Sequence, residues 1–311
     1  MFKNAKENNL MFEKISIIGC GLIGSSILRN INSKKISKKV TVFDKEKSVV
    51  DTIKKENLCD NISKDIQTAI SDSDLVILCV PLSSYKEVLL AGKDYFKKNV
   101  IITDTGSVKK EVNKIFDNLN LKDIFWISSH PIAGTEESGP LAGFKDLFKN
   151  RWTIICKSEN DNKDQVEKLK KFWEFLGSKV KLMNASEHDQ ILALTSHLPH
   201  AVAYNIVMTA ISADDKFKDD IIKYSAGGLR DFTRIASSDP IMWRDIFLDN
   251  SVNIINILDK FSDNIDDFKN AITEKNGSKL LKIFSSTKNL RKEIIKAGQD
   301  VESPDFGRKK N

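Results

Sequence analysis

The 311-residue sequence lacks the cysteine patterns that hold a fold together through disulfides or metal. It has four cysteines and no Cys-x-x-Cys pair, so neither a disulfide framework nor a cysteine-based zinc site is expected. Cys79 and Cys156 lie in apolar runs, and Cys20 lies between two glycines. We therefore predict reduced, mostly buried thiols in a cytoplasmic protein.

Long apolar runs and blocks of like charge are also missing. No apolar run reaches the roughly 20 residues that span a membrane. Residues 1–12 are polar and lack the apolar core of a signal peptide, so we expect a loose N-terminal extension. The formal charge of +6 is spread as lysine among acidic residues and asparagine, which argues against a nucleic-acid partner. With 41% hydrophobic residues, the chain can bury the cores of about two domains.

A glycine-rich motif stands between a predicted strand and a predicted helix. Residues 14–18 are an apolar run, Gly-Cys-Gly-Leu-Ile-Gly follows, and a helix is expected from Ser25. In this setting the first glycine makes the turn, the second lets backbone approach a pyrophosphate, and the third allows close helix packing. The helix N-terminus attracts the phosphates. We predict a dinucleotide site that includes Gly19, Gly21, Leu22, Ile23 and Gly24.

An acidic residue ends the second predicted strand. Asp44 lies 20 residues after Gly24, which is the spacing of a ribose-binding carboxylate. Such a carboxylate accepts hydrogen bonds from ribose hydroxyls and repels a 2′-phosphate, so NAD is favoured over NADP. Lys45 and Lys47 soften that preference. The alternative role of Asp44 is to cap a helix.

Further apolar runs alternate with helical patterns. Strands are predicted at 74–81, 100–104, 125–127, 152–156 and 179–183, with helices at 112–119 and 165–176. This alternation predicts a Rossmann-type, doubly wound parallel sheet over residues 13–184. Residues that follow the strand ends are expected to line the cofactor crevice: Val80, Pro81, Thr105, Gly106 and Ser107. Ser107 could also cap a helix.

His130 follows the predicted strand 125–127 and opens a loop with Pro131, Gly134 and Gly139. Ligands of parallel sheets bind where strands end, so His130 is expected near the ligand. Its pKa near neutrality makes histidine a candidate acid or base. The alternative is a histidine that only ties the loop by hydrogen bonds.

Past residue 184 the sequence predicts helices only. A long apolar helix, capped by Ser186, extends to about residue 211 and is hydrophobic on more than one face, as in a core or a subunit interface. Other helices are expected at 221–226, 229–236, 241–261 and beyond 278. We predict a helical domain at 185–297 and a polar tail at 298–311.

Three of the four histidines lie on the long helix. His197 and His200 have a spacing that could hold a metal. However, no carboxylate or cysteine partner has ligand spacing, and Pro199 disturbs the helix between them, so no metal is predicted. At least one of the three, which include His188, is expected to face a substrate. Core packing or capping is the alternative for the others.

Arg230 and Arg234 lie four residues apart and share a helix face. Like charges at this spacing repel unless water or an anion matches them. The planar guanidinium binds carboxylates through two hydrogen bonds, which makes these residues candidates for an anionic substrate. Gly227 and Gly228 would let a loop fold over that ligand. Solvated arginines are the alternative.

These pieces together resemble the prephenate/arogenate dehydrogenase (TyrA) family. The matching stretches are residues 19–24, 104–109, 130–136, 198–200 and 230–236. The glycine motif is common to many dehydrogenases, whereas the histidine and Thr-Arg-Ile-Ala stretches are far more specific. Ser25 and Leu229 depart from the residues that are frequent in the family, and neither position touches the expected chemistry.

The resemblance implies NAD-dependent oxidative decarboxylation of prephenate to 4-hydroxyphenylpyruvate, and a dimer through the helical domain. His130 would accept the proton of the ring C4 hydroxyl as hydride leaves C4. Ser107 would orient His130, Arg234 would bind a substrate carboxylate, and His200 would help to hold the substrate. The remaining pocket residues would be Thr135, Glu136, Gly227, Asp231 and Trp243.

Three alternatives stay open. The substrate could be arogenate, or both compounds, because they differ only by a keto or an amino group. A dehydrogenase of the β-hydroxyacid type would instead use a catalytic lysine in the helical half. A non-catalytic NAD-sensing protein would need neither His130 nor Arg234. Since only a polar tail follows Ala297, any inhibition by tyrosine is expected at the active site.

Overall fold

The computed structural model describes residues 10–212 and 218–296. The predicted tail 298–311 and most of the predicted N-terminal extension lie outside these residues. The described chain falls into two compact units, divided between Ile254 and Ile255. The first unit contains all eight strands found in the described residues.

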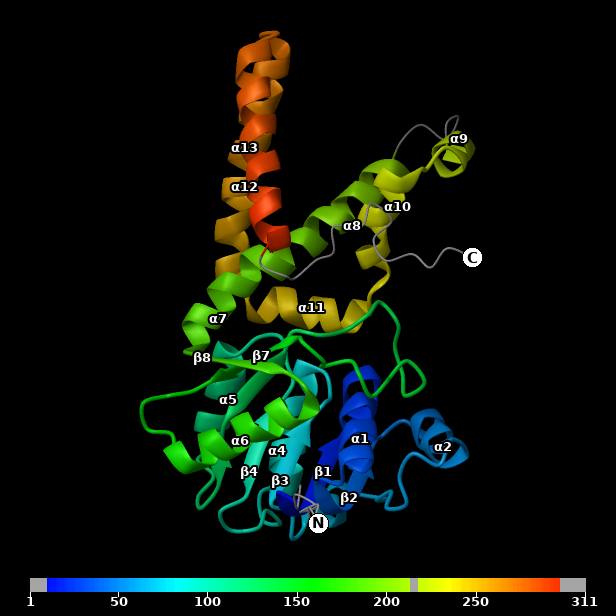
Figure 1. Cartoon of the computed structure of the whole chain (residues 1–311), viewed down its shortest axis with the longest axis vertical. Helices are drawn as coiled ribbons and strands as arrows, with labels where there is room; N and C mark the ends of the chain where they lie inside the picture. The colour runs from blue at the N-terminus through cyan, green and yellow to red at the C-terminus, as the bar shows by residue number, and fades with distance from the viewer. Residues whose placement is uncertain (1–9, 213–217, 297–311) are drawn as a thin grey trace, which may run out of the picture. The chain divides into compact units, whose positions relative to one another are not determined.

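Five strands form a parallel sheet in the order β2-β1-β3-β4-β5 (Figure 1). The strand order changes direction between β1 and β3, so the carboxyl ends of these two strands border the crevice in which such sheets bind ligands. The predicted glycine motif follows β1 directly. The strands are β1 (Phe12–Ile18), β2 (Ser37–Phe43), β3 (Leu75–Leu78), β4 (Ile101–Asp104) and β5 (Phe125–Trp126).

Both faces of this sheet are buried, which explains the continuous apolar runs. Side chains alternate between faces along a strand. In β1, Ile15 and Ile17 belong to one hydrophobic cluster and Ile18 to the other. The first cluster includes α1 (Leu22–Lys34), α2 (Lys47–Lys55) and α6 (Lys163–Leu176); the second includes α3 (Ile66–Ile70), the 3₁₀ turn η1 (Leu82–Ser84), α4 (Tyr85–Gly92) and α5 (Lys110–Leu119).

The domain begins slightly earlier than predicted. Phe12, which we assigned to the loose extension, is the first residue of β1 and is buried. Its ring meets Phe172 of α6 edge-on, with centroids 6.0 Å apart. The polar residues that precede Phe12 gave no indication that its side chain belongs to the hydrophobic core beside α6.

A second sheet has the order β6-β7-β8, and its strands are β6 (Ser128–Pro131), β7 (Trp152–Cys156) and β8 (Lys179–Met183). β6 and β7 are antiparallel, whereas β7 and β8 are parallel. His130 therefore lies within a short strand, and not in a loop after a strand as predicted. Ile127, the last residue of the predicted strand, lies between β5 and β6, where the chain passes from one sheet to the other.

A series of helices follows β8, in agreement with the prediction. Asn184, and not Ser186, caps the first helix, because its side chain accepts a hydrogen bond from the Glu187 amide at 2.8 Å. Gly227 and Gly228 begin a helix and do not form the predicted loop. The elements are α7 (Ala185–Leu192), the π-helical segment η2 (Ala193–His197), α8 (Leu198–Ile211), α9 (Lys218–Lys223), α10 (Gly227–Arg234), the 3₁₀ turn η4 (Ile235–Ser237) and α11 (Pro240–Asp249).

The helical run Ala185–Ile211 is, by length and composition alone, long and apolar enough to cross a membrane. This corrects our expectation that no run reaches such a length. Composition of this kind is also found in helices that pack at interfaces. Its polar N-terminal end is hydrogen-bonded to the part of the chain that holds the parallel sheet: Asp189 accepts hydrogen bonds from the backbone amides of Lys109 and Lys110, both at 2.9 Å.

The boundary between the two units lies after residue 254, and not after residue 184 as predicted, because two helices are hydrogen-bonded to the Rossmann-type part of the chain. Asp189 of α7 makes such bonds, as described above. Asp245 of α11 accepts a hydrogen bond from the Ser83 amide at 3.2 Å. Trp243 and Ile246 of α11 belong to the same hydrophobic cluster as α4 and α5.

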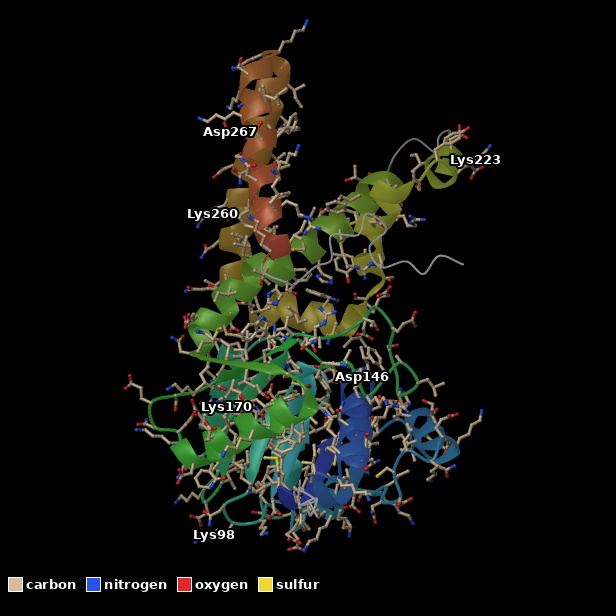
Figure 2. The ribbon with its side chains drawn as sticks, in the orientation of Figure 1. Lys98, Asp146, Lys170, Lys223, Lys260 and Asp267 are labelled. Atoms are coloured by element: carbon tan, nitrogen blue, oxygen red, sulfur yellow. The ribbon has the colours of Figure 1, made fainter. Side chains whose placement is uncertain are left out.

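The predicted helix 241–261 is interrupted at Asn250, where α11 ends and α12 (Ser251–Thr273) begins. The second unit consists of most of α12 and of α13 (Gly277–Lys296). Within it the rings of Phe268 and Phe284 lie 6.0 Å apart, and Lys279 pairs with Asp267, which is labelled in Figure 2.

Candidate active site

The glycine motif adopts the geometry that its three glycines predict. Gly19 has a positive φ of 90°, and a Cβ there would lie 2.6 Å from the carbonyl oxygen of Cys79. A Cβ on Gly24 would lie 2.2 Å from the carbonyl oxygen of Gly19. A Cβ on Gly21, in contrast, would meet nothing within 4 Å. The turn and the helix packing therefore need glycine, and open space remains at the N-terminus of α1, where a phosphate fits.

Asp44 lies beside this motif. Its carboxylate accepts hydrogen bonds from the Cys20 amide at 2.7 Å and the Glu46 amide at 2.9 Å. Val80 borders Gly19 on the other side of the crevice. Leu22 and Ile23 form the first turn of α1, Pro81 follows Val80 at the surface, and Thr105 and Gly106 extend from the end of β4. The predicted cofactor residues thus come from the ends of neighbouring strands at one edge of the sheet.

A buried ion pair supports the strand that carries His130. Lys109 and Asp104 are both fully buried, and the Lys109 Nζ atom lies 2.5 Å from Asp104 Oδ2. The same ammonium group donates to the carbonyl oxygen of Ser129 at 2.7 Å. Asp104 also accepts hydrogen bonds from the Ser129 and Gly106 amides and from the Tyr85 hydroxyl. Charge pairing and hydrogen bonds therefore fix β6 beside β4.

His130 lies at one end of a chain of polar side chains. Its Nδ1 atom lies 2.8 Å from Nε2 of His188, and Nδ1 of His188 lies 2.7 Å from Oδ1 of Asp189. His188 and Asp189 are buried completely or nearly so, and His130 is only 8% exposed. The three residues come from β6 and α7, and His130 and His188 are 58 positions apart in the sequence.

The surroundings keep His130 neutral near pH 7. Burial lowers the pKa of His130 well below 6.5, and the neighbouring His188, Lys109 and His197 lower it further. Burial also lowers the pKa of His188, although its hydrogen bond to Asp189 acts in the opposite direction. A neutral imidazole can accept a proton, so the site can supply a base.

We predicted that Ser107 would orient His130. Within the described residues no hydrogen bond joins the two, and the Nδ1 atom of His130 contacts His188 instead. Ser107 is half-buried, between β4 and α5. Nor does Ser107 cap α5, whose N-cap position is Lys109.

A second group of predicted residues gathers around Trp243. The rings of His200 and Trp243 are stacked, with centroids 3.7 Å apart and an angle of 24°. His200 Nδ1 donates to the carbonyl oxygen of Ser196 at 2.9 Å, which leaves Nε2 as an acceptor. Burial lowers the pKa of His200, and the charge of Arg234 lowers it further. Arg234 in turn pairs with Glu136 at 3.2 Å.

His197 lies between the two groups. Its ring meets Trp243 edge-on at a centroid distance of 6.1 Å, and its charged form would repel that of His130. Burial lowers the pKa of His197 to about 4. Its Nδ1 atom is 3.1 Å from Nδ2 of Asn250, which also donates to the carbonyl oxygen of Asp189 at 2.9 Å. Within the described residues, no group of three histidine, cysteine, aspartate or glutamate side chains could hold a metal.

The other predicted pocket residues are Thr135, Gly227 and Asp231. Thr135 is exposed, and its hydroxyl accepts a hydrogen bond from the Glu137 amide at 3.2 Å. Gly227 starts α10, and a Cβ there would have Arg230 Nη2 as its nearest neighbour, 3.9 Å away. Asp231 lies 3.7 Å from Arg230.

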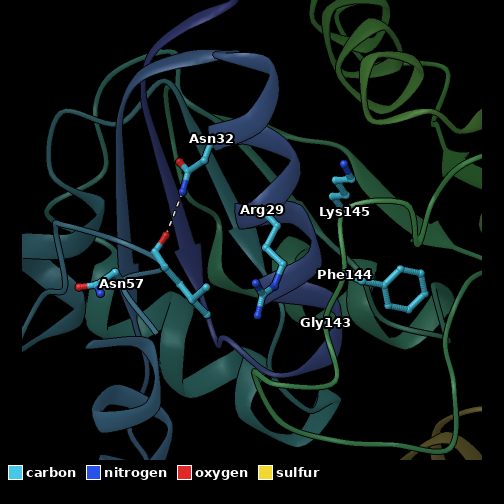
Figure 3. Close-up of a pocket in the computed structure, with 7 residues that line it drawn as sticks. Arg29, Asn32, Asn57, Gly143, Phe144 and Lys145 are labelled. Carbon is cyan, nitrogen blue, oxygen red and sulfur yellow. Dashed lines mark hydrogen bonds between the residues drawn. The ribbon is translucent and has the colours of Figure 1, made fainter. Parts of the chain in front are cut away.

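A surface depression of about 390 Å³ lies elsewhere, on α1 (Figure 3). It forms where the segment after β6 packs on α1: the Phe144 amide donates to Ser26 Oγ at 3.1 Å, and Arg29 donates to the carbonyl oxygen of Pro140 at 3.3 Å. None of the predicted site residues lines it. Its lining consists of Arg29, Asn32, Asn57, Leu58, Gly143, Phe144 and Lys145.

Several residues around His130 have contacts that the sequence does not indicate. The sequence presents His188 as one of three histidines that could face a substrate, and Lys109 and Asp104 as parts of a stretch that matches the family. It indicates no role in the site for Asp189. A lysine five residues after an aspartate and a histidine next to an aspartate were visible in the sequence. Their partners across the fold were not.

Comparison with known proteins gives the family. Residues 27–182 match the family model described as prephenate dehydrogenase, nucleotide-binding domain, and residues 184–286 match the prephenate dehydrogenase dimerization domain. The chain belongs to the prephenate dehydrogenase family. The family resemblance and the fold class predicted from the sequence, a Rossmann-type sheet followed by a helical part, are confirmed.

Individual relatives agree with this assignment. The chain is 40% identical to a cyclohexadienyl dehydrogenase of Zymomonas mobilis over 291 residues, which are 94% of this chain and 99% of the relative. It is 30% identical to a prephenate dehydrogenase of Lactococcus lactis, over 90% of this chain and 77% of the relative. Its fold matches the crystal structure of Aquifex aeolicus prephenate dehydrogenase in complex with hydroxyphenyl propionate and NAD+, with a TM-score of 0.84 and 30% identity, over 91% and 98% of the two chains.

Proposed function

We propose that this protein catalyses the NAD-dependent oxidative decarboxylation of prephenate to 4-hydroxyphenylpyruvate, a step of tyrosine synthesis, in the cytoplasm. The observation that carries the proposal is a buried, neutral histidine, His130, next to a dinucleotide crevice in a member of the prephenate dehydrogenase family. The related Aquifex aeolicus enzyme binds NAD+ and a hydroxyphenyl compound, which supports both ligands.

The residues fit the cofactor. Open space at Gly21 and the N-terminus of α1 suit a pyrophosphate, and Asp44 suits a ribose with free hydroxyls. When bound, NAD+ supplies a hydride acceptor. His130 would accept the proton of the C4 hydroxyl through Nε2 as the C4–H bond gives up its hydride. The ring carboxylate then leaves as CO2, and its bonding electrons complete the aromatic ring as a phenolate. The phenolate oxygen takes the proton back from His130, so the products are 4-hydroxyphenylpyruvate, CO2 and NADH.

Arg234 and His200 are proposed to hold the substrate. Arg234 is 58% exposed and pairs with Glu136, so a substrate carboxylate could replace that partner at a moderate cost. The Nε2 atom of His200 faces away from its Ser196 hydrogen bond and can accept or share one with the substrate. Binding energy at these two residues would position the C4 hydroxyl at His130.

The identity of the relatives favours a second candidate substrate. The Zymomonas mobilis relative is named a cyclohexadienyl dehydrogenase, so oxidation of arogenate to tyrosine by the same steps is the alternative function. Prephenate and arogenate share the ring, the C4 hydroxyl and both carboxylates. They differ only in the keto or amino group of the side chain.

We further propose that the protein is a homodimer. Residues 184–286 match the family's dimerization domain, and α8 exposes large apolar side chains, among them Met208 and Ile211, which are 65% and 63% exposed. A second copy that covers these side chains would remove this apolar surface from water. Light scattering of the purified protein should then give about twice the mass of one chain.

The proposed reaction is tested by the absorbance of NADH. Purified protein is mixed with NAD+ and either prephenate or arogenate. NADH formation with prephenate, with or without arogenate, supports the proposal, whereas NADH with arogenate alone supports the alternative. No NADH with either substrate, at neutral and alkaline pH and with NADP+ also tried, would leave the non-catalytic NAD-sensing protein as the better account.

A further inference from the structure

The hydrogen-bond chain behind His130 contains two residues whose effect extends beyond packing. We propose that His188 and Asp189 are positioning residues that hold His130 in the tautomer with a bare Nε2 atom and that share the positive charge His130 gains during the reaction. This inference rests on the proposed function of His130 as the base. The tautomer itself can be observed without turnover.

Asp189 fixes the position of the protons along the chain. Its carboxylate has no proton to donate, so Nδ1 of His188, 2.7 Å away, must carry one. Neutral His188 then has a bare Nε2, which accepts a hydrogen bond from Nδ1–H of His130 at 2.8 Å. Neutral His130 therefore has its only proton on Nδ1. Its Nε2 atom is left as the acceptor that a base needs.

Asp189 is itself held firmly in place. Its two oxygens accept hydrogen bonds from the amides of Lys109 and Lys110, at the start of α5. Asn250 of the helical part donates to its backbone carbonyl. The carboxylate is therefore fixed by the segment that also supplies Lys109 to β6. The position of α7 on the Rossmann part and the tautomer of His130 depend on the same contacts.

The charges around the chain also support this role. The titratable groups that act on His130 are His188 of α7, Lys109 from the β4–α5 segment and His197 of η2. Those that act on His188 include Asp189, Lys109 and Asp104. Lys109 is paired with Asp104. Asp189 is then the anion that can stabilise a proton arriving on His130, through His188. In water-excluded surroundings such an interaction is stronger than at a surface.

Three variants separate this role from packing. His188→Phe keeps a ring in the buried site but removes the acceptor for His130. His188→Gln restores an acceptor, because its amide oxygen reaches the position of the imidazole Nε2 atom. Asp189→Asn removes the negative charge. Glu187→Gln, at an exposed position next to these residues, is the matched control for the loss of one carboxylate charge on α7.

The decisive readout is the protonation of His130 by long-range ¹H–¹⁵N NMR, which is practicable because the chain has only four histidines. In the wild type and in His188→Gln we expect His130 to carry its proton on Nδ1. In His188→Phe we expect the proton on Nε2, with kcat lower by about 10²- to 10⁴-fold. A wild-type His130 with its proton on Nε2, or His188→Phe with unchanged kcat, would overturn the inference.

Asp189→Asn provides a test by pH that does not need the His188 variants to fold. Because protonated His130 is less stabilised in this variant, the acid limb of its pH profile of kcat/KM should move to lower pH, and the plateau value of kcat/KM should fall. The profile of Glu187→Gln should match that of the wild type. A lower plateau with an unmoved acid limb would show packing alone and would refute the proposal. If the wild type turns over neither prephenate nor arogenate, the proposed function fails, and the NMR spectra still decide the tautomer.

Discussion

Replacing Lys109 by methionine should destabilise the protein strongly. The substitution keeps the length and shape of the side chain but removes its charge. The Asp104 carboxylate, fully buried, would lose the ammonium group 2.5 Å away, and the carbonyl oxygen of Ser129 would lose a hydrogen bond. Three other donors to Asp104 would remain: the amides of Gly106 and Ser129 and the hydroxyl of Tyr85.

The expected loss is large because one charge stays buried without its partner. Removing one member of a buried ion pair costs about 3–5 kcal/mol. For a unit of roughly 150–250 residues, each kcal/mol lowers the melting temperature by about 2–4 °C, so a decrease of roughly 6–20 °C is expected. Differential scanning calorimetry or urea unfolding of the purified variant measures it.

The matched control is Lys98→Met. Lys98 also pairs with an aspartate, Asp123, but at 3.4 Å and with 72% of its side chain exposed (Figure 2). Exposed pairs contribute about 0–1 kcal/mol, so this variant should melt within a few degrees of the wild type. A Lys109→Met variant as stable as Lys98→Met would refute the reasoning that the buried pair fixes β6. A double variant with Asp104→Asn should recover part of the loss, since no unpaired charge would remain.

Three further predictions follow from the site. Arg234→Ala should raise KM for prephenate by roughly 10- to 100-fold, which corresponds to the loss of one or two hydrogen bonds to a charged group, and should leave KM for NAD+ unchanged. If steady-state assays give the variant and the wild type the same KM for prephenate, Arg234 does not bind the substrate. Asp44→Asn should raise KM for NAD+ and lower KM for NADP+, and an unaltered ratio of the two would contradict a ribose contact. Protein stability should decrease as pH falls from 7.5 to 5, because the folded protein lowers the pKa values of its histidines, to about 4 for His197, and the unfolded chain therefore binds more protons in this range. His197 alone accounts for a loss of about 2 kcal/mol at pH 5. A urea unfolding midpoint that is equal or higher at pH 5 would contradict this prediction.

Local sequence was sufficient for the features that short-range geometry controls. The strand, glycine turn and helix at residues 14–28 could be predicted because Gly19 and Gly24 are required by contacts within the motif itself or with the next strand. The buried strands of the parallel sheet were visible as apolar runs because both of their faces are covered. The chain's division into a Rossmann-type part and helices followed from the same patterns.

Features that depend on partners far along the chain were not predictable. Nothing in the short run at residues 125–127 indicates that a second strand in another sheet follows it, because β6 has the polar sequence Ser-Ser-His-Pro and lacks the apolar pattern of a buried strand. The break at Asn250 is similarly hidden within a helical pattern, and depends on bonds from its side chain to Asp189 and His197. The contact between His130 and His188 joins residues 58 positions apart, so no local pattern indicates it.

The role of His130 as the base is the central claim, and its most direct test is single-turnover formation of NADH by the wild type and by His130→Asn. With saturating NAD+ and prephenate, we expect the variant to bind NAD+ as tightly as the wild type but to form NADH about 10²- to 10⁴-fold more slowly. An equal rate in the two proteins would contradict it, because the proton of the substrate hydroxyl would then have another acceptor.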